Sequence, residues 1–193
     1  MKNQRILLLD NYDSFTYNLV HYIEELTGQR CEIVRNDAFE IKDLENYDAL
    51  IISPGPGLPE ESGCLIAVIK TAMELRMKVL GVCLGMQAMA VAAGGSLKQL
   101  DHVMHGLQRN CTITIENDLL LAGIPRIFSA GRYHSWIVDA YTLPAEYIVT
   151  SVDEDNNIMS ISHRSHAMFG VQFHPESIMT LMGKKIMENW LLI

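Results

Sequence analysis

The sequence predicts an α/β protein built on a doubly wound, mostly parallel sheet with helices on both of its faces. Short runs rich in Ile, Leu and Val alternate with amphipathic helical patterns through the first half of the chain. Strand, helix and strand in succession form right-handed crossovers, and ligand sites in such sheets lie beyond the carboxyl ends of the strands. Closely spaced strand-like pieces in the second half predict antiparallel additions to the sheet.

The first half contains four expected strands and two expected helices. The strands are RILLL at 5–9, CEIV at 31–34, ALII at 49–52 and KVLGV at 78–82. The first helix begins after Asp13 or Ser14, either of which could cap it, and Gly28 is placed to end it. The second helix lies over 65–73, where apolar residues recur at i, i+3, i+4, i+7 and i+8.

The second half contains shorter strands and a final helix. The expected strands are TITI at 112–115, YIVTS at 147–151, IMSIS at 158–162 and FGVQF at 169–173. The final helix carries Ile186, Met187, Trp190 and Leu191 on one face. Because no repeat, low-complexity segment or linker interrupts the sequence, residues 1–193 are expected to form a single domain.

Composition excludes several classes of protein. The 15 Lys and Arg residues against 23 Asp and Glu give a net charge of -8, and no basic cluster is long enough to follow a phosphate backbone, so nucleic acid is not an expected partner. The 4 cysteines lie far apart and have no metal-ligand spacing, which indicates reduced thiols in a cytoplasm and no metal site. The N-terminus and the later segments lack the apolar length of a signal peptide or a membrane span.

The stretch KVLGVCLGMQAM at 78–89 places Cys83 between Gly81 and Gly85, where an apolar run meets a helical run. Such a turn strains the backbone at its central residue, and glycines two positions away remove side chains that would collide there. The turn would lift the thiol out of the core, near the positive end of the helix dipole and the backbone N–H of Leu84. The alternative is a buried structural cysteine, because free cysteine often fills cores.

The stretch GVQFHPES offers a base for such a nucleophile. An apolar strand ends at His174, Pro175 fixes the backbone, and Glu176 follows. Residues two apart in an extended chain face the same way, so the Glu176 carboxylate can hold the imidazole in one tautomer. Cys83, His174 and Glu176 would then form a triad. The alternative is a surface turn that follows a strand.

The loop SPGPG at 53–57 directly follows the strand ALII. Gly55 and Gly57 let the backbone approach a ligand closely, and the flanking prolines stiffen the loop so that its N–H groups need no reorganisation. The alternative is a rigid turn. Glycine-rich loops also bind phosphate, but neither G-x-x-x-x-G-K nor G-x-G-x-x-G occurs here.

Together, the segments DNYDSFTYNL, SPGPG, GVCLGMQ, RYHSW and GVQFHPES resemble the class I, triad-type glutamine amidotransferases over essentially the whole chain. Within that family the resemblance is to the small subunits of anthranilate synthase and aminodeoxychorismate synthase. It implies hydrolysis of L-glutamine to glutamate and transfer of ammonia to a chorismate-binding partner subunit. It also implies no cofactor in this chain, with Mg²⁺ expected only in the partner.

The resemblance also implies roles for individual residues. Cys83 would be the nucleophile, His174 its base and then its acid, and Glu176 the orienting carboxylate. The oxyanion hole and the glutamine contacts would come from Gly55, Pro56, Gly57, Leu84, Gln87, Ser135 and Trp136. Segments 10–16 and 103–106 would face the partner.

Several alternatives stay open at the level of sequence. Anthranilate synthase is the favoured assembly over aminodeoxychorismate synthase or a subunit shared by both. The acid-rich segment 10–16 is also typical of a phospho-acceptor receiver domain, but such a domain would carry its acceptor Asp where this chain has Ser53-Pro54. A free-standing gamma-glutamyl amidase and a binding subunit without catalysis are further alternatives, and the intact triad argues against the latter.

Overall fold

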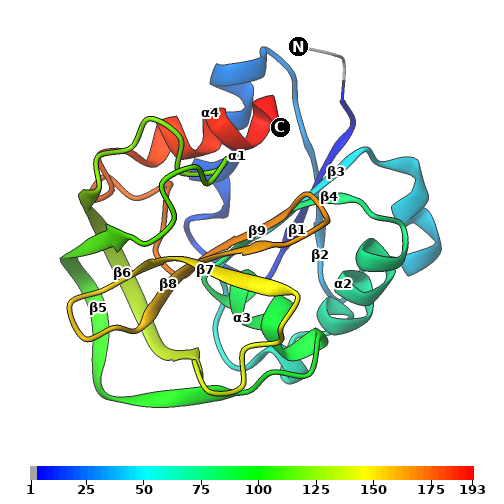
Figure 1. Ribbon diagram of the computed structural model, residues 1–193. Helices are drawn as coiled ribbons and strands as arrows, with labels where there is room; N and C mark the ends of the chain where they lie inside the picture. Colours follow the sequence, from blue (N-terminus) through cyan, green and yellow to red (C-terminus); the bar gives the residue numbers. More distant parts are fainter. Residues whose placement is uncertain (1–3) are drawn as a thin grey trace.

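The computed structural model describes residues 4–193, and one nine-stranded sheet runs through them (Figure 1). The strand order is β2-β1-β3-β4-β9-β8-β7-β5-β6, with parallel pairing from β2 to β9 and antiparallel pairing from β9 to β6. This arrangement confirms the predicted fold class. Residues 1–3, part of the segment in which no signal peptide is expected, lie outside the described residues.

The parallel half of the sheet forms where the apolar runs predict it. Its first four strands are β1 (Ile6–Asp10), β2 (Glu32–Arg35), β3 (Ala49–Ile52) and β4 (Lys78–Val82). Side chains alternate between the two faces of a strand. Ile6 and Leu8 therefore enter one hydrophobic core, whereas Leu7 and Leu9 enter a second core on the opposite face.

Helices cover both faces of the sheet (Figure 1). The α-helices are α1 (Thr16–Thr27), α2 (Leu65–Glu74), α3 (Leu84–Ala92) and α4 (Gly183–Leu192), and the short 3₁₀ helices are η1 (Ile41–Asn46) and η2 (Pro59–Glu61). Apolar residues of α1 and α4 belong to one core, and those of α2 and most of α3 belong to the other. The sheet is thus the middle layer of three.

The two ends of α1 compare differently with the prediction. Gly28 ends the helix as predicted, because its φ of 71° is left-handed and its N–H donates to Glu24 O at 2.8 Å. At the start, the capping position is taken by Phe15, whose side chain makes no capping bond, so a cap by Asp13 or Ser14 is wrong. Asp13 Oδ1 instead accepts the N–H of Phe15 at 2.7 Å and orders the turn before the helix.

The second half contains two long strands that the sequence pattern does not predict. They are β5 (Leu97–Ile113) and β6 (Ile127–Val138), and the predicted strand at 112–115 is only the end of β5. Most of β5 is exposed, and irregularities between Gln99 and Met104 and between His105 and Leu107 interrupt its pairing with β6. An exposed, bulged strand has no continuous apolar run and no regular alternation, so its pattern is lost.

The remaining strands connect the two halves of the sheet. They are β7 (Tyr147–Val152), β8 (Ile158–His163) and β9 (Met168–Val171). The expectation that β9 is an antiparallel addition is right for its edge with β8 and wrong for its edge with β4, where the pairing is parallel. The residues that follow β9 therefore lie beside those that follow β4.

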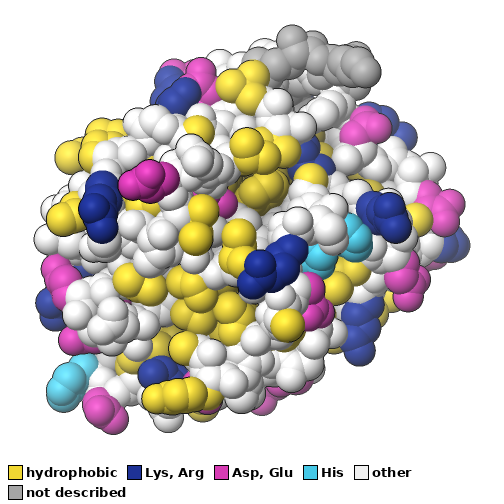
Figure 2. All heavy atoms as spheres, viewed as in Figure 1, with side chains coloured by type: hydrophobic (Ala, Val, Ile, Leu, Met, Phe, Trp, Pro, Cys, Tyr) yellow, Lys and Arg dark blue, Asp and Glu magenta, His cyan; other side chains and the backbone are white. Residues whose placement is uncertain are grey.

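The exterior carries charges of both signs. On the face drawn in Figure 2, acidic and basic side chains are interspersed with apolar ones. Across residues 4–193, every helix is too short or too polar to cross a membrane.

Candidate active site

Cys83 occupies a strained turn between β4 and α3. Its φ of 51° and ψ of -101° lie in a region that residues other than glycine rarely adopt. A Cβ on Gly81 would lie 2.6 Å from the backbone carbon of Gly85, and one on Gly85 would lie 2.7 Å from Ile52 O. The elbow is present as predicted. Cys83 is nevertheless only 6% exposed, so it is recessed rather than raised to the surface.

His174 and Glu176 follow β9 and face each other. His174 Nδ1 lies 2.7 Å from Glu176 Oε1, and both side chains are buried. The pairing is as predicted, but its cause is a turn and not an extended chain. Ser177 N–H donates to His174 O at 3.2 Å, and Pro175 takes the second turn position, for which its fixed φ is suited.

The surroundings of His174 favour its protonated form. Burial on its own would lower the pKa of His174, but the neighbouring Cys83 and Glu176 outweigh burial and raise it to about 10. The rings of Tyr133 and Phe15 pack edge-on against the imidazole, with centroids 4.8 and 5.8 Å away. Thr180 Oγ1 also donates to His174 O at 2.6 Å. The imidazolium is thus held in place from several elements.

A cavity of about 170 Å³ opens over Cys83. Its lining is Gly55, Pro56, Gly57, Cys83, Gln87, Tyr133, His134, Ser135 and Trp136. It therefore brings together the loop after β3, the start of α3 and the middle of β6, which include most of the residues predicted for glutamine binding. The N–H of Leu84 belongs to the first turn of α3, where N–H groups have no acceptor within the helix.

The loop at 53–57 is fastened to the segment after β1. Asn11 N–H donates to Ser53 Oγ at 2.8 Å, and Asn11 Nδ2 donates to Ser53 O at 2.9 Å. A Cβ on Gly55 would lie 2.6 Å from Asn11 Cβ and from Asn11 O, so only glycine permits this approach. Asn11 was not among the predicted site residues, because its contact with the loop bridges distant parts of the sequence.

Two further buried side chains in this region were not predicted. Gln172 Nε2 donates to Cys83 Sγ at 3.4 Å, and a polar residue inside the apolar run FGVQF was the available signal. His134 lies in the cavity wall within RYHSW. Burial first, and then the charges of Arg132 and His174, lower the pKa of His134 to about 4, so its ring is neutral at pH 7.

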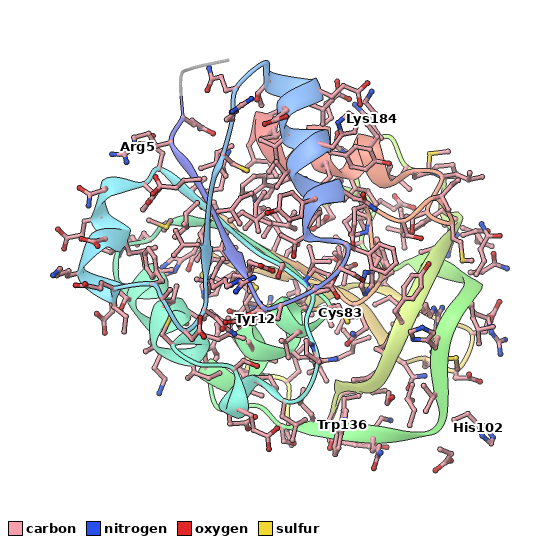
Figure 3. All side chains as sticks on the ribbon, turned by 180° about the vertical axis from the view of Figure 1, so that it is seen from behind. Arg5, Tyr12, Cys83, His102, Trp136 and Lys184 are labelled. Carbon is pink, nitrogen blue, oxygen red and sulfur yellow. The ribbon has the colours of Figure 1, made fainter. Side chains whose placement is uncertain are left out.

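The site lies at one end of the sheet. Cys83 and Tyr12 share that end, whereas Arg5 marks the opposite one (Figure 3).

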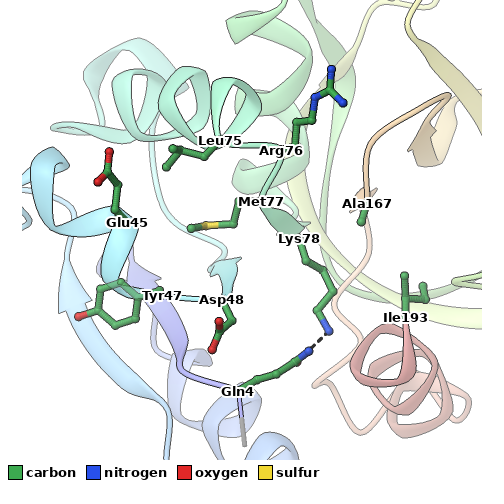
Figure 4. A pocket seen from close by; sticks show the side chains of 10 residues that line it. All are labelled: Gln4, Glu45, Tyr47, Asp48, Leu75, Arg76, Met77, Lys78, Ala167 and Ile193. Atoms are coloured by element: carbon green, nitrogen blue, oxygen red, sulfur yellow. Dashed lines mark hydrogen bonds between the residues drawn. The ribbon is translucent and has the colours of Figure 1, made fainter. Parts of the chain in front are cut away.

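A second cavity, of about 720 Å³, lies near the amino ends of β3 and β4, and there Lys78 Nζ donates to Gln4 Oε1 at 3.0 Å (Figure 4). Over residues 4–193, no group of three or more His, Cys, Asp or Glu is arranged to hold a metal ion.

A comparison of the sequence with known protein families found a match that covers the fold and the cysteine elbow. A model of the family "Glutamine amidotransferase class-I" matches residues 7–193. The chain therefore belongs to the class I glutamine amidotransferases.

Individual proteins of known name are similar to this chain in sequence or in fold. The chain is 43% identical over 190 residues to the aminodeoxychorismate/anthranilate synthase component 2 of Bacillus subtilis, which covers 96% of this chain and 95% of that protein. It is 39% identical over 193 residues to the bifunctional protein TrpGD of Thermotoga maritima, covering 98% of this chain but only 32% of that protein's length. The crystal structure of a glutamine amidotransferase from Thermotoga maritima shares the fold, with a TM-score of 0.80, 16% identity and coverage of 100% of this chain and 82% of that one.

Proposed function

We propose that this chain is the glutaminase subunit of anthranilate synthase, with residues 1–193 acting as one domain. In this proposal it hydrolyses L-glutamine through Cys83, His174 and Glu176 and delivers ammonia to a chorismate-converting partner subunit. One observation carries the proposal: a strained, recessed Cys83 lies beside His174, whose Nδ1 faces the Glu176 carboxylate at 2.7 Å. Membership of the amidotransferase family supplies the substrate class.

The first half of the proposed reaction forms a thioester. Because His174 is protonated at neutral pH, its positive charge can stabilise the Cys83 sulfur in the thiolate form. The sulfur attacks the carboxamide carbon of glutamine, and the new oxyanion is stabilised by N–H groups of Leu84 and of the loop 55–57. His174 Nε2 then gives its proton to the departing nitrogen, the C–N bond breaks, and ammonia leaves.

The second half restores the enzyme. The neutral His174 Nε2 takes a proton from water, and the resulting hydroxide attacks the thioester carbon. The C–S bond breaks, the sulfur leaves as a thiolate beside the imidazolium, and glutamate is released. Glu176 holds the imidazole so that Nε2 faces the reacting atoms throughout, and it stabilises the charged ring.

Substrate positioning is assigned to the cavity wall. Gln87, Ser135 and Trp136 line the cavity around Cys83 and are proposed to hold the amino and carboxylate ends of glutamine. All four cysteines are free thiols, which is the state expected of a cytoplasmic enzyme.

A second assembly is a specific alternative for the same chemistry. The similar protein of Bacillus subtilis is named as component 2 of both aminodeoxychorismate and anthranilate synthase. Purification of this chain with its native partner, followed by a product assay with chorismate and glutamine, distinguishes the outcomes. Anthranilate supports the proposal, whereas aminodeoxychorismate alone assigns the chain to the other assembly.

Covalent labelling tests the nucleophile directly. A glutamine-like diazoketone should leave one adduct, and peptide mass spectrometry should place it on Cys83. Labelling mainly at Cys31, Cys64 or Cys111 would refute the assignment. Burial raises the pKa of all three of these thiols, so they are expected to react slowly.

A further inference from the structure

We propose that Gln172 acts on the nucleophile itself: its side-chain amide donates to the Cys83 sulfur and favours the thiolate over the thiol. This inference rests on the proposed role of Cys83. Gln172 lies directly after β9 and two positions before His174, so the segment that follows β9 contributes to the site twice.

Gln172 reaches Cys83 because β4 and β9 are parallel neighbours. Val82 pairs with Val171, and Cys83 N–H donates to Val171 O at 2.7 Å, so Gln172 follows directly alongside the elbow. Its own backbone N–H donates to Met159 O at 2.8 Å, which ties it to β8. The residue is completely buried. The position of the amide is therefore set by the sheet and not by a mobile loop.

The direction of the amide follows from a chain of hydrogen bonds that starts at a backbone carbonyl. Trp136 O can only accept, so the Gln87 atom at 2.7 Å from it must be the amide nitrogen. The same Gln87 nitrogen lies 3.2 Å from Gln172, which must therefore present its oxygen. The Gln172 nitrogen is left facing Cys83 Sγ at 3.4 Å. The sulfur thus meets an N–H donor rather than a carbonyl.

A donor fixed in this way distinguishes the two forms of the sulfur. A thiol is a weak acceptor, whereas a hydrogen bond to an anion is roughly twice as strong as one between neutral groups. Hydrogen bonding to the charged form favours that form. In the proposed reaction the sulfur is anionic before attack and again when the thioester breaks, so the amide would act in both halves.

Other ionisable groups around the elbow are few, and their effects on Cys83 can be distinguished from the effect of Gln172. The segment after β9 provides His174, paired with Glu176, and β6 provides Arg132, Tyr133 and His134. Burial keeps His134 neutral at pH 7, and Arg132 is paired with Asp153 at 2.6 Å. Helix α3 and the loop 53–57 contain no ionisable side chain, and segment 10–16 contributes Asp10, Tyr12 and Asp13. None of these groups changes when Gln172 is replaced.

The test is the pH dependence of Cys83 alkylation by iodoacetamide, followed by mass spectrometry of the Cys83 peptide. Gln172→Glu keeps the shape and the bond from Gln87 but places a carboxylate oxygen against the sulfur. Gln172→Met removes the amide without adding charge. We expect alkylation at pH 7 to slow about tenfold in Gln172→Met and further in Gln172→Glu, with both profiles moved to higher pH.

A matched control separates this effect from added charge. Gln29→Glu introduces the same carboxylate beyond the end of α1, away from the elbow, and should leave the alkylation profile unchanged. Equal alkylation profiles for the unchanged protein, Gln172→Met and Gln172→Glu would overturn the inference. Iodoacetamide alkylates Cys83 in the absence of glutamine. If the chain never released glutamate, the proposed function would be refuted, but the alkylation measurement would still test the contact of Gln172 with Cys83.

A measurement on the unchanged sequence covers the case in which both variants misfold. In ¹H–¹⁵N spectra, one glutamine side-chain amide should shift over the same pH range in which Cys83 becomes reactive, and this shift should vanish in Cys83→Ser. If no glutamine amide follows the ionisation of Cys83, the inference is wrong.

Discussion

Replacing Glu176 with glutamine is the sharpest test of how His174 works. The change keeps the size of the side chain and removes the charge that faces His174 Nδ1 at 2.7 Å. Both side chains are almost completely buried, at 3% and 0% exposure, so solvent screens the pair little. The variant therefore isolates a charge-assisted hydrogen bond in a dry site.

The size of the effect follows from that burial. A hydrogen bond to a charged group contributes about 1.5–3 kcal/mol, which corresponds to about 10- to 150-fold in a rate that depends on it. Glu176 does not line the cavity over Cys83. The loss should therefore appear in kcat for glutamate release, with KM for glutamine nearly unchanged.

The pH profile provides a second readout. Glu176 is one of the groups that raise the pKa of His174, so the imidazolium of the variant should be lost at a lower pH than in the unchanged protein. The alkaline limb of the pH–rate profile should therefore move to lower pH in the variant. Steady-state kinetics of the complex with its partner, from pH 6 to pH 10, measure both effects. A variant with unchanged kcat and a raised KM would refute the reasoning.

Three further predictions concern packing, coupling and acid stability. Gly85→Ala should lower the free energy of unfolding by about 1–3 kcal/mol in urea titrations, because its Cβ would meet Ile52 O at 2.7 Å; an unchanged midpoint would contradict the packing. The isolated chain should release glutamate about 5- to 150-fold more slowly than its complex with partner and chorismate, and equal rates would favour a free-standing amidase. Because the pKa of His134 is lowered to about 4, the unfolded chain binds an extra proton below about pH 6.5; stability should therefore fall between pH 6.5 and pH 4, and His134→Gln should reduce this fall.

The sequence by itself determined the features that depend on neighbours along the chain. The strands β3 and β4 begin and end as their apolar runs predict, and α1 ends at Gly28 because glycine readily adopts a left-handed φ. The elbow at Cys83 follows from the glycines two positions away, and the His174–Glu176 pairing follows from their short separation. Each of these signals lies within a few residues, so no knowledge of the fold is needed to recognise it.

The tertiary structure decided everything that depends on which strands lie side by side. Parallel pairing of β4 with β9 places Gln172 against Cys83 across 89 positions of sequence, and the contact of Asn11 with Ser53 spans 42. The strands β5 and β6 also emerged only in three dimensions, because β5 is exposed and bulged, and because β6 buries polar residues such as Arg132 and His134 that interrupt its apolar pattern. The register between distant strands is set by the packing of the whole sheet against its helices. The sequence of one strand therefore does not indicate which other strand will pair with it.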